Sequence, residues 1–295
     1  MDGYGPSSPW YKFPPAYMLA FMPWVTPVNT AEDIGKNVDA QARKIWIVHV
    51  FRYLGSLILL LLLLKGSASP WFILHGLAMG LTFTPFFESL YGLIFDNVLL
   101  FLLALILFLN KAGKNRLAGW CIGLAAMLKV YPAILILWAI AVKDWKIVLG
   151  AIAAAMLLLS GSLLVFGVEN HLFYYTRLLP LLLQESSLVA KEGNFSLGAQ
   201  FVGLWQETGT AMLWFSIYKN LMMAATISLL LYGKVYDNCF RFAAMKLSLI
   251  ACMTILYLPN YWGNYQLVLI LPVLTLLGNA YALSLIHISE PTRPY

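Results

Sequence analysis

The chain has 295 residues, of which 61% are hydrophobic and 11% charged, and its mean hydropathy is +0.78. Apolar stretches of about 17 or more residues, a length suited to membrane segments, recur along it. This composition excludes a soluble domain and indicates a polytopic, all-α membrane protein. The net charge of +6 forms no basic stripe, so it informs topology and does not indicate a nucleic-acid partner.

The first apolar segment, residues 14–28, carries Pro14, Pro15, Pro23 and Pro27. It predicts a short helix at the membrane interface, because prolines interrupt a spanning helix. The residues before it hold no basic and apolar leader, so we expect an N-terminally truncated piece of a longer protein. About eight later segments are predicted to lie in the membrane: 45–64, 71–87, 88–109, 117–142, 147–167, 210–232, 242–258 and 265–281.

Two carboxylates fall within these predicted segments. Glu88 and Asp96 are about two helical turns apart, which places them roughly on one face of a helix. Carboxylates at membrane depth are functional candidates by default, so both are candidate catalytic residues. The alternative for Glu88 is that it marks a helix end.

Lys129 is the most informative residue of the chain. A lysine at bilayer depth costs roughly 2.5–3.5 kcal/mol, so a partner, a cavity or a function must compensate. Pro132 disfavours helical geometry at Tyr131, which predicts a helix break near Lys129 with polar backbone facing protein or water. Lys129 and Tyr131 are therefore candidates for binding an anionic group. The alternative is a lysine that snorkels to the interface.

Basic residues flank 117–142 at both ends, so a single crossing would violate the positive-inside rule. We therefore predict a re-entrant or sharply kinked element centred on 129–132. The loops expected in the cytoplasm hold nine basic and two acidic residues, against six and eight in the loops expected outside. The first set is 65–70, 110–116, 143–146 and 233–246; the second is 1–13, 29–44 and 168–208.

Later candidates lie on the side expected to be outside. Arg177, after Tyr174 and Tyr175, is either a second cation for an anionic substrate or an interfacial anchor. The turn 259–265 offers Asn260, Asn264 and Tyr265, which suit either sugar binding or an interfacial belt. We expect a pocket open to this side, lined by Lys129, Tyr131, Glu88 and this turn.

Metal chemistry has no sequence support. His49, His75 and His171 are isolated and lack metal-ligand spacing, so a structural role is expected for them. No Asp-x-Asp pair occurs near the predicted segments. The sequence therefore predicts neither a metal nor another cofactor.

Four motifs carry a family resemblance: Tyr11-Lys-Phe-Pro-Pro, the run from Ala118 to Pro132, Lys143-Asp-Trp-Lys, and Asn194-Phe-Ser-Leu. Their order and spacing resemble glycosyltransferase family 87 over roughly residues 9–282. This family comprises type-C membrane glycosyltransferases related to the phosphatidylinositol mannoside mannosyltransferase. The resemblance implies transfer of a hexose, typically mannose, from a polyprenyl-phosphate donor to a lipid or glycan acceptor on the outer face of the cell membrane. It also makes Asn194 a candidate binding residue.

The chain departs from the family pattern in two places. The stretch from Gly92 to Asn97 stands where the family has a Gly-Gln-x-Asn-like sequence, without its glutamine. The family's catalytic aspartate follows a first spanning helix that has no counterpart here, so we expect this piece to lack it. Residues 283–295 resemble a translated sequencing adapter, and we expect the glycosyltransferase module to occupy 1–282.

Two function classes remain open. The favoured class is a multi-pass membrane glycosyltransferase in which Lys129 stabilises the departing phosphate and a carboxylate deprotonates the acceptor hydroxyl. The alternative is a transporter or lipid-binding protein, because a broken helix with a buried charge also builds transporter sites. In the intact enzyme Lys129→Met is expected to abolish sugar transfer from polyprenyl-phosphate mannose and to keep the fold, because it removes a charge from the membrane interior.

Overall fold

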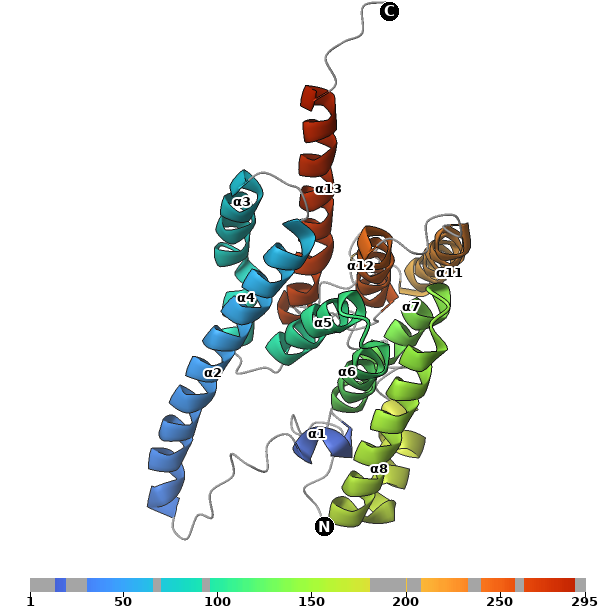
Figure 1. The fold of residues 1–295 in the computed structure, drawn as a ribbon. Coiled ribbons are helices and arrows are strands. Elements are labelled where there is room, and N and C mark those ends of the chain that lie inside the picture. Colours follow the sequence, from blue (N-terminus) through green and yellow to red (C-terminus); the bar gives the residue numbers. More distant parts are fainter. Residues whose placement is uncertain are drawn as a thin grey trace, which may run out of the picture.

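The computed structural model describes residues 14–19, 31–65, 70–91, 96–180, 200, 208–232, 240–257 and 263–289. Within these residues every regular element is a helix and none is a strand, which confirms the all-α class. The long helices α2 (Ala31–Lys65) and α8 (Trp145–Phe173) stand on opposite sides of the bundle, with α5 (Asp96–Lys111) and α6 (Asn115–Leu128) between them (Figure 1).

The remaining elements complete the bundle around this centre. They are α1 (Pro15–Leu19), α3 (Pro70–Leu81), α4 (Thr84–Tyr91), the 3₁₀ helix η3 (Tyr131–Leu135), α7 (Ile136–Ala141), the π-helical turn η4 (Tyr174–Leu178), α11 (Thr208–Tyr232), α12 (Phe240–Tyr257), the 3₁₀ helix η7 (Gly263–Leu269) and α13 (Ile270–Ser289). A short helix at the start of the first apolar segment is thus present, with Pro15 at its first position, where proline is tolerated.

One predicted boundary is wrong. The expected segments 71–87 and 88–109 meet inside α4, whereas in the structure α3 ends at Leu81, α4 begins at Thr84 and α5 begins at Asp96. Thr84 and Pro85 begin a new helix, since proline is well suited to the first turn. Glu88 and Asp96 therefore lie in different helices, and the expectation that they share one helix face is wrong.

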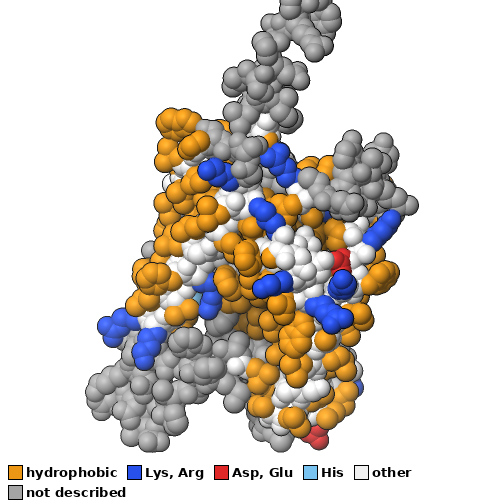
Figure 2. Space-filling view, viewed as in Figure 1, with side chains coloured by type: hydrophobic (Ala, Val, Ile, Leu, Met, Phe, Trp, Pro, Cys, Tyr) orange, Lys and Arg blue, Asp and Glu red, His pale blue; other side chains and the backbone are white. Residues whose placement is uncertain are grey.

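Three stretches of the described residues are long and apolar enough to cross a bilayer by length and composition: Arg43–Lys65, Trp145–Leu178 and Leu213–Leu230. The third of these, in α11, and the exposed side of α8 present large apolar side chains at the surface, as lipid-facing helices do. Figure 2 shows hydrophobic side chains covering much of the visible face. The expected number of eight segments stays a prediction.

The predicted hairpin at 117–142 is present. Asn115 at the start of α6 donates a hydrogen bond to Asp144, the N-cap of α8, so both ends of the segment meet. The helices α6 and α8 run parallel, because Gly119 faces Ile147 and Gly123 faces Ala154. Two consecutive helices can run parallel only if the chain between them travels back to the starting end of the first. The segment formed by η3 and α7 therefore runs back along α6.

Glycines make the contact between α6 and α8 close. A Cβ atom at Gly119 would meet the carbonyl oxygen of Ile147, and one at Gly150 would meet the carbonyl oxygen of Arg116. Backbones that approach this closely gain van der Waals contact, which is the main attraction between helices in lipid. This contact fixes the position of the hairpin in the bundle.

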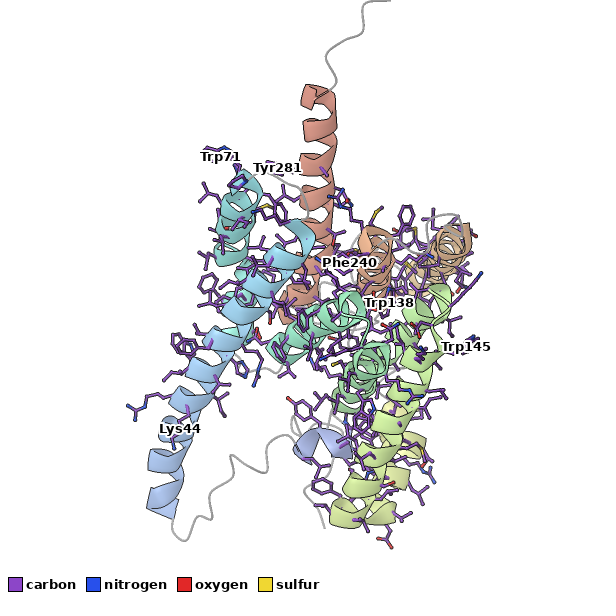
Figure 3. The ribbon with its side chains drawn as sticks, viewed as in Figure 1. Lys44, Trp71, Trp138, Trp145, Phe240 and Tyr281 are labelled. Carbon is purple, nitrogen blue, oxygen red and sulfur yellow. The ribbon has the colours of Figure 1, made fainter. Side chains whose placement is uncertain are left out.

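The returning arm of the hairpin is anchored on α12. Trp138 of α7 is fully buried, and its indole nitrogen donates to the carbonyl oxygen of Ala243 at 2.9 Å. Lys246 of α12 is buried too and donates to the carbonyl oxygen of Ala141 at 3.2 Å, at the end of α7. Figure 3 shows Trp138 in the interior of the bundle close to Phe240 at the start of α12.

Candidate functional site

The helix break predicted at Lys129 is present. α6 ends at Leu128, and Lys129 has extended backbone angles, φ −140° and ψ 138°. The 3₁₀ helix η3 begins at Tyr131, with Pro132 in its first turn. Proline cannot donate the backbone hydrogen bond that would continue α6, so the chain ends one helix and begins another at this depth.

Lys129 is buried against a carboxylate. Its ammonium nitrogen lies 2.5 Å from Oδ1 of Asp96, and the two side chains are 4% and 0% exposed. Asp96 is in the first turn of α5, where the helix dipole also favours a negative charge. The snorkelling interpretation of Lys129 is therefore wrong, because the side chain points into the protein.

This ion pair changes what Lys129→Met is expected to do. The sequence-based expectation treated Lys129 as an isolated cation whose removal costs no stability. In the structure, its removal leaves Asp96 charged, buried and unpaired, which destabilises proteins by about 3–5 kcal/mol. The expectation of an unchanged fold is therefore corrected.

Further polar groups from α2 lie beside the pair. Asn97, next to Asp96, is fully buried, and its amide nitrogen lies 3.0 Å from Nδ1 of His49. Arg52 is one turn after His49 and is half-buried, and one of its terminal nitrogens is buried without a hydrogen-bond partner among the described residues. The start of α5 is thus a polar region within an apolar bundle.

Sequence reasoning missed Arg52 although a signal was present. The rule that selected Lys129, a charge inside an apolar segment, applies equally to Arg52 within 45–64. His49 was assigned a structural role, and its contact with Asn97 is compatible with that assignment. Nothing in the sequence linked His49 to Asn97, because 48 residues separate them.

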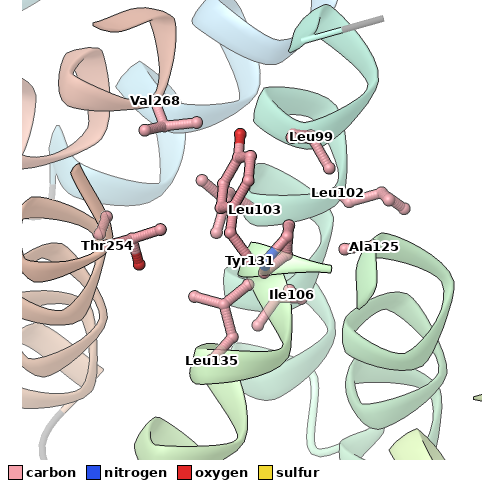
Figure 4. Close-up of a pocket in the computed structure, with 11 residues that line it drawn as sticks. Leu99, Leu102, Leu103, Ile106, Ala125, Tyr131, Leu135, Thr254 and Val268 are labelled. Carbon is pink, nitrogen blue, oxygen red and sulfur yellow. The ribbon is translucent and has the colours of Figure 1, made fainter. Parts of the chain in front are cut away.

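An apolar cavity adjoins the polar region. It is small, with a volume of about 20 Å³, and is lined by Leu99, Leu102, Leu103, Ile106, Ala125, Tyr131, Pro132, Leu135, Ala251, Thr254 and Val268. Figure 4 shows the Tyr131 ring in the middle of this space, between residues of α5 and those of α12 and η7. The ring centroid also lies 5.8 Å from the Lys129 ammonium nitrogen, so Tyr131 links the cavity to the ion pair.

Two other predicted site residues, Glu88 and Arg177, are not brought to this cavity. Glu88 and Arg177 are exposed, and neither lines it. Asn264 and Tyr265 belong to η7, which contributes Val268 to the lining, but their side chains are outside the described part. Asn194 and Asn260 lie outside the described residues. Roles for these residues stay predictions.

The comparison with protein families was decisive. The model of glycosyltransferase family 87 matches residues 11–259, which is most of the chain. The chain belongs to glycosyltransferase family 87. The match includes the Lys129 break, the start of α5 and α12. No curated protein and no solved structure matches the chain.

Membership of this family makes the protein a glycosyltransferase, and the apolar helices indicate that it resides in a membrane. For such an enzyme the arrangement has a simple chemical meaning. The cavity presents an apolar lining beside the site, while the buried ammonium of Lys129 can neutralise a developing negative charge. Tyr131 occupies the boundary between the two parts.

Proposed function

We propose that this family 87 enzyme transfers a hexose, with mannose as the first candidate, from a polyprenyl-phosphate donor to a lipid or glycan acceptor on the outer face of the cell membrane. The observation that carries the proposal is the buried Lys129–Asp96 pair beside an apolar cavity. A polyprenyl-phosphate sugar combines a long apolar chain with one phosphate. These two parts match the apolar lining of the cavity and the cation of Lys129.

In the proposed binding mode the prenyl units nearest the phosphate pack against the apolar side chains that line the cavity, among them Leu99, Leu103 and Val268, and these side chains move apart to admit them. The phosphate then lies at the polar end, beyond Tyr131 and within reach of Lys129. Asp96 pairs with the Lys129 ammonium before the donor arrives, because an unpaired cation is unfavourable in apolar surroundings. The donor phosphate shares or displaces this contact when it binds.

The proposed reaction is a substitution at the anomeric carbon of the donor sugar. The acceptor hydroxyl oxygen forms a bond to that carbon, the bond from the carbon to the phosphate oxygen breaks, and the phosphate leaves with the electron pair. Lys129 stabilises the negative charge on the leaving phosphate. A carboxylate accepts the hydroxyl proton. Asp96 suits that role better than Glu88, which is exposed and lines no part of the cavity.

The test compares two buried lysines. Lys129 and Lys246 are 4% and 6% exposed, but only Lys129 is paired with Asp96 beside the cavity. Transfer of labelled mannose from polyprenyl-phosphate mannose is measured in membranes, per unit of folded protein, for Lys129→Met and Lys246→Met. We expect a loss on the order of 10²–10³-fold for the first variant, as for loss of an oxyanion-type donor, and near wild-type transfer for the second.

A charge-swapped variant separates catalysis from folding. Asp96→Lys combined with Lys129→Asp keeps a buried pair of opposite charges but moves the cation to α5. We expect this variant to fold better than Lys129→Met and still to lack transfer. Transfer at the wild-type rate by either Lys129 variant would contradict the proposed role. A wild-type enzyme that uses only a nucleotide sugar would contradict the proposed donor.

A further inference from the structure

Two basic turns lie side by side at the open end of the hairpin. The first turn, residues 110–116, connects α5 to α6, and the second, residues 142–146, connects α7 to α8. The hydrogen bond from the Asn115 side chain to the Asp144 carboxylate joins them. Because α6 and α8 run parallel, both helices begin at this surface.

Four cations of these turns are exposed. Their side chains form no hydrogen bond or ion pair within the described part of the chain, and we call this set the hairpin basic patch: Lys114, Arg116, Lys143 and Lys146. Asp144 does not neutralise the patch by pairing with these side chains, because one oxygen accepts from Asn115 and the other from the backbone nitrogen of Lys146. Figure 2 shows lysine and arginine side chains gathered where α5, α6, α7 and α8 meet.

Neighbouring cations have a different function. Lys111 donates to the carbonyl oxygen of Leu63 at 3.5 Å and lies over the Phe240 ring, and Lys246 donates to Ala141. These two lysines satisfy the carbonyl ends of helices, as cations at helix C-termini commonly do. The patch cannot be explained in this way, because its side chains make no such contacts.

Lys143 stands at a position that favours glycine. Its φ is 53°, the left-handed region, whereas the same position of the first turn is Gly113, with φ 71°. The two turns have matching hydrogen bonds, from Lys114 to Leu109 and from Asp144 to Ala139 across each helix end. A lysine at such a position lowers stability relative to glycine, so the charged side chain is kept at a conformational cost.

The patch borders the apolar surface of the bundle. Trp145 is 66% exposed and Leu149 is 61% exposed, immediately beyond the patch along α8. Figure 3 shows Trp145 at the outer edge of the molecule. A tryptophan between charged and apolar surface is typical of the headgroup level of a membrane. The surface therefore offers cations for a phosphate and, below them, apolar side chains for acyl chains.

We propose that the hairpin basic patch binds the phosphate headgroup of an anionic phospholipid from the adjacent leaflet. The cations of the patch complement an anionic headgroup, and the apolar side chains next to the patch favour a lipid over a soluble anion. By the loop charges, this leaflet is the cytoplasmic one, opposite the proposed transfer reaction. The inference is independent of the proposed donor and acceptor.

The experiment uses the full chain purified in detergent. Retention of dioctanoyl phosphatidylglycerol is titrated by native mass spectrometry, with dioctanoyl phosphatidylcholine as the zwitterionic comparison. The patch variant is Lys143→Gln/Lys146→Gln, and the matched control is Arg43→Gln/Lys44→Gln, two adjacent exposed cations of α2. Each lost cation is expected to weaken binding to an anionic lipid about fivefold. We therefore expect the patch variant, which loses two cations, to bind phosphatidylglycerol on the order of 30-fold more weakly, with no change in the control.

Lys143→Gly is a variant in which weaker lipid binding cannot be attributed to unfolding. Glycine relieves the backbone at φ 53°, so we expect a higher unfolding temperature together with roughly fivefold weaker phosphatidylglycerol binding. Equal phosphatidylglycerol binding by the patch variant and the α2 control would overturn the proposal. Displacement of the bound lipid by an equal concentration of inorganic phosphate would also overturn it, because the site would then recognise a free anion.

Discussion

The Lys129–Asp96 pair gives the site its character. An ammonium group alone at this depth would be too unfavourable to keep, and a carboxylate alone would be equally so. Together they form a neutral but strongly polar unit at the edge of an apolar cavity. A site of this kind can exchange one anion for another without first exposing an uncompensated charge.

Removing one partner of the pair is expected to destabilise the protein more than removing both. We expect Lys129→Met to lower the free energy of unfolding by about 3–5 kcal/mol, because Asp96 remains buried without its partner. The double variant Lys129→Met/Asp96→Leu removes both charges and should recover most of that loss. The measurement is the unfolding temperature of detergent-purified protein. A single variant as stable as the wild type would show that the pair is not formed in solution.

At the scale of elements, the contact between α6 and α8 positions everything that the site requires. It holds the arm that ends at Lys129, and α7 returns from that point to α12. The closeness of the two backbones at Gly119 and Gly123 leaves no room for a side chain. The site therefore depends on glycines that do not line the cavity.

A matched pair of glycine substitutions tests this dependence. We expect Gly119→Leu to separate α6 from α8 and to destabilise the protein by several times the roughly 1 kcal/mol of an ordinary substitution. Gly161→Leu on α8 is the control, because a Cβ atom there has open space around it. Unfolding temperatures and expression in membranes provide the measurement. Equal behaviour of the two variants would contradict the close contact.

Much of the whole molecule was predictable from apolar runs, prolines and charges. The hairpin followed from basic residues at both ends of one apolar segment, and the break from Pro132. Tertiary pairing was not predictable: 33 residues separate Asp96 from Lys129, and local patterns do not specify which polar groups meet inside a bundle. The boundary between 71–87 and 88–109 was misplaced because it was set by apolar length alone, although Thr84 and Pro85 offered a helix-start signal.

The topology of the whole molecule provides the last prediction. Because Asn115 bonds Asp144, we expect the turns before α6 and after α7 to share one membrane side, and the positive-inside rule predicts that this side is the cytoplasm. Single cysteines at Gly113 and Trp145, in a variant with Cys121, Cys239 and Cys252 replaced by alanine, should react with a membrane-impermeant maleimide only in inverted vesicles.

A cysteine at Lys44, near the opposite end of α2, should react only in right-side-out vesicles, which controls for vesicle orientation. Labelling at 113 and 145 from opposite sides would mean that 117–142 crosses the membrane once. The parallel arrangement of α6 and α8 would then be impossible, because the chain would enter α8 from the wrong side. Labelling from the same side leaves Lys129 at the turning point of a re-entrant hairpin, at a depth where a lipid-borne phosphate can meet a buried cation.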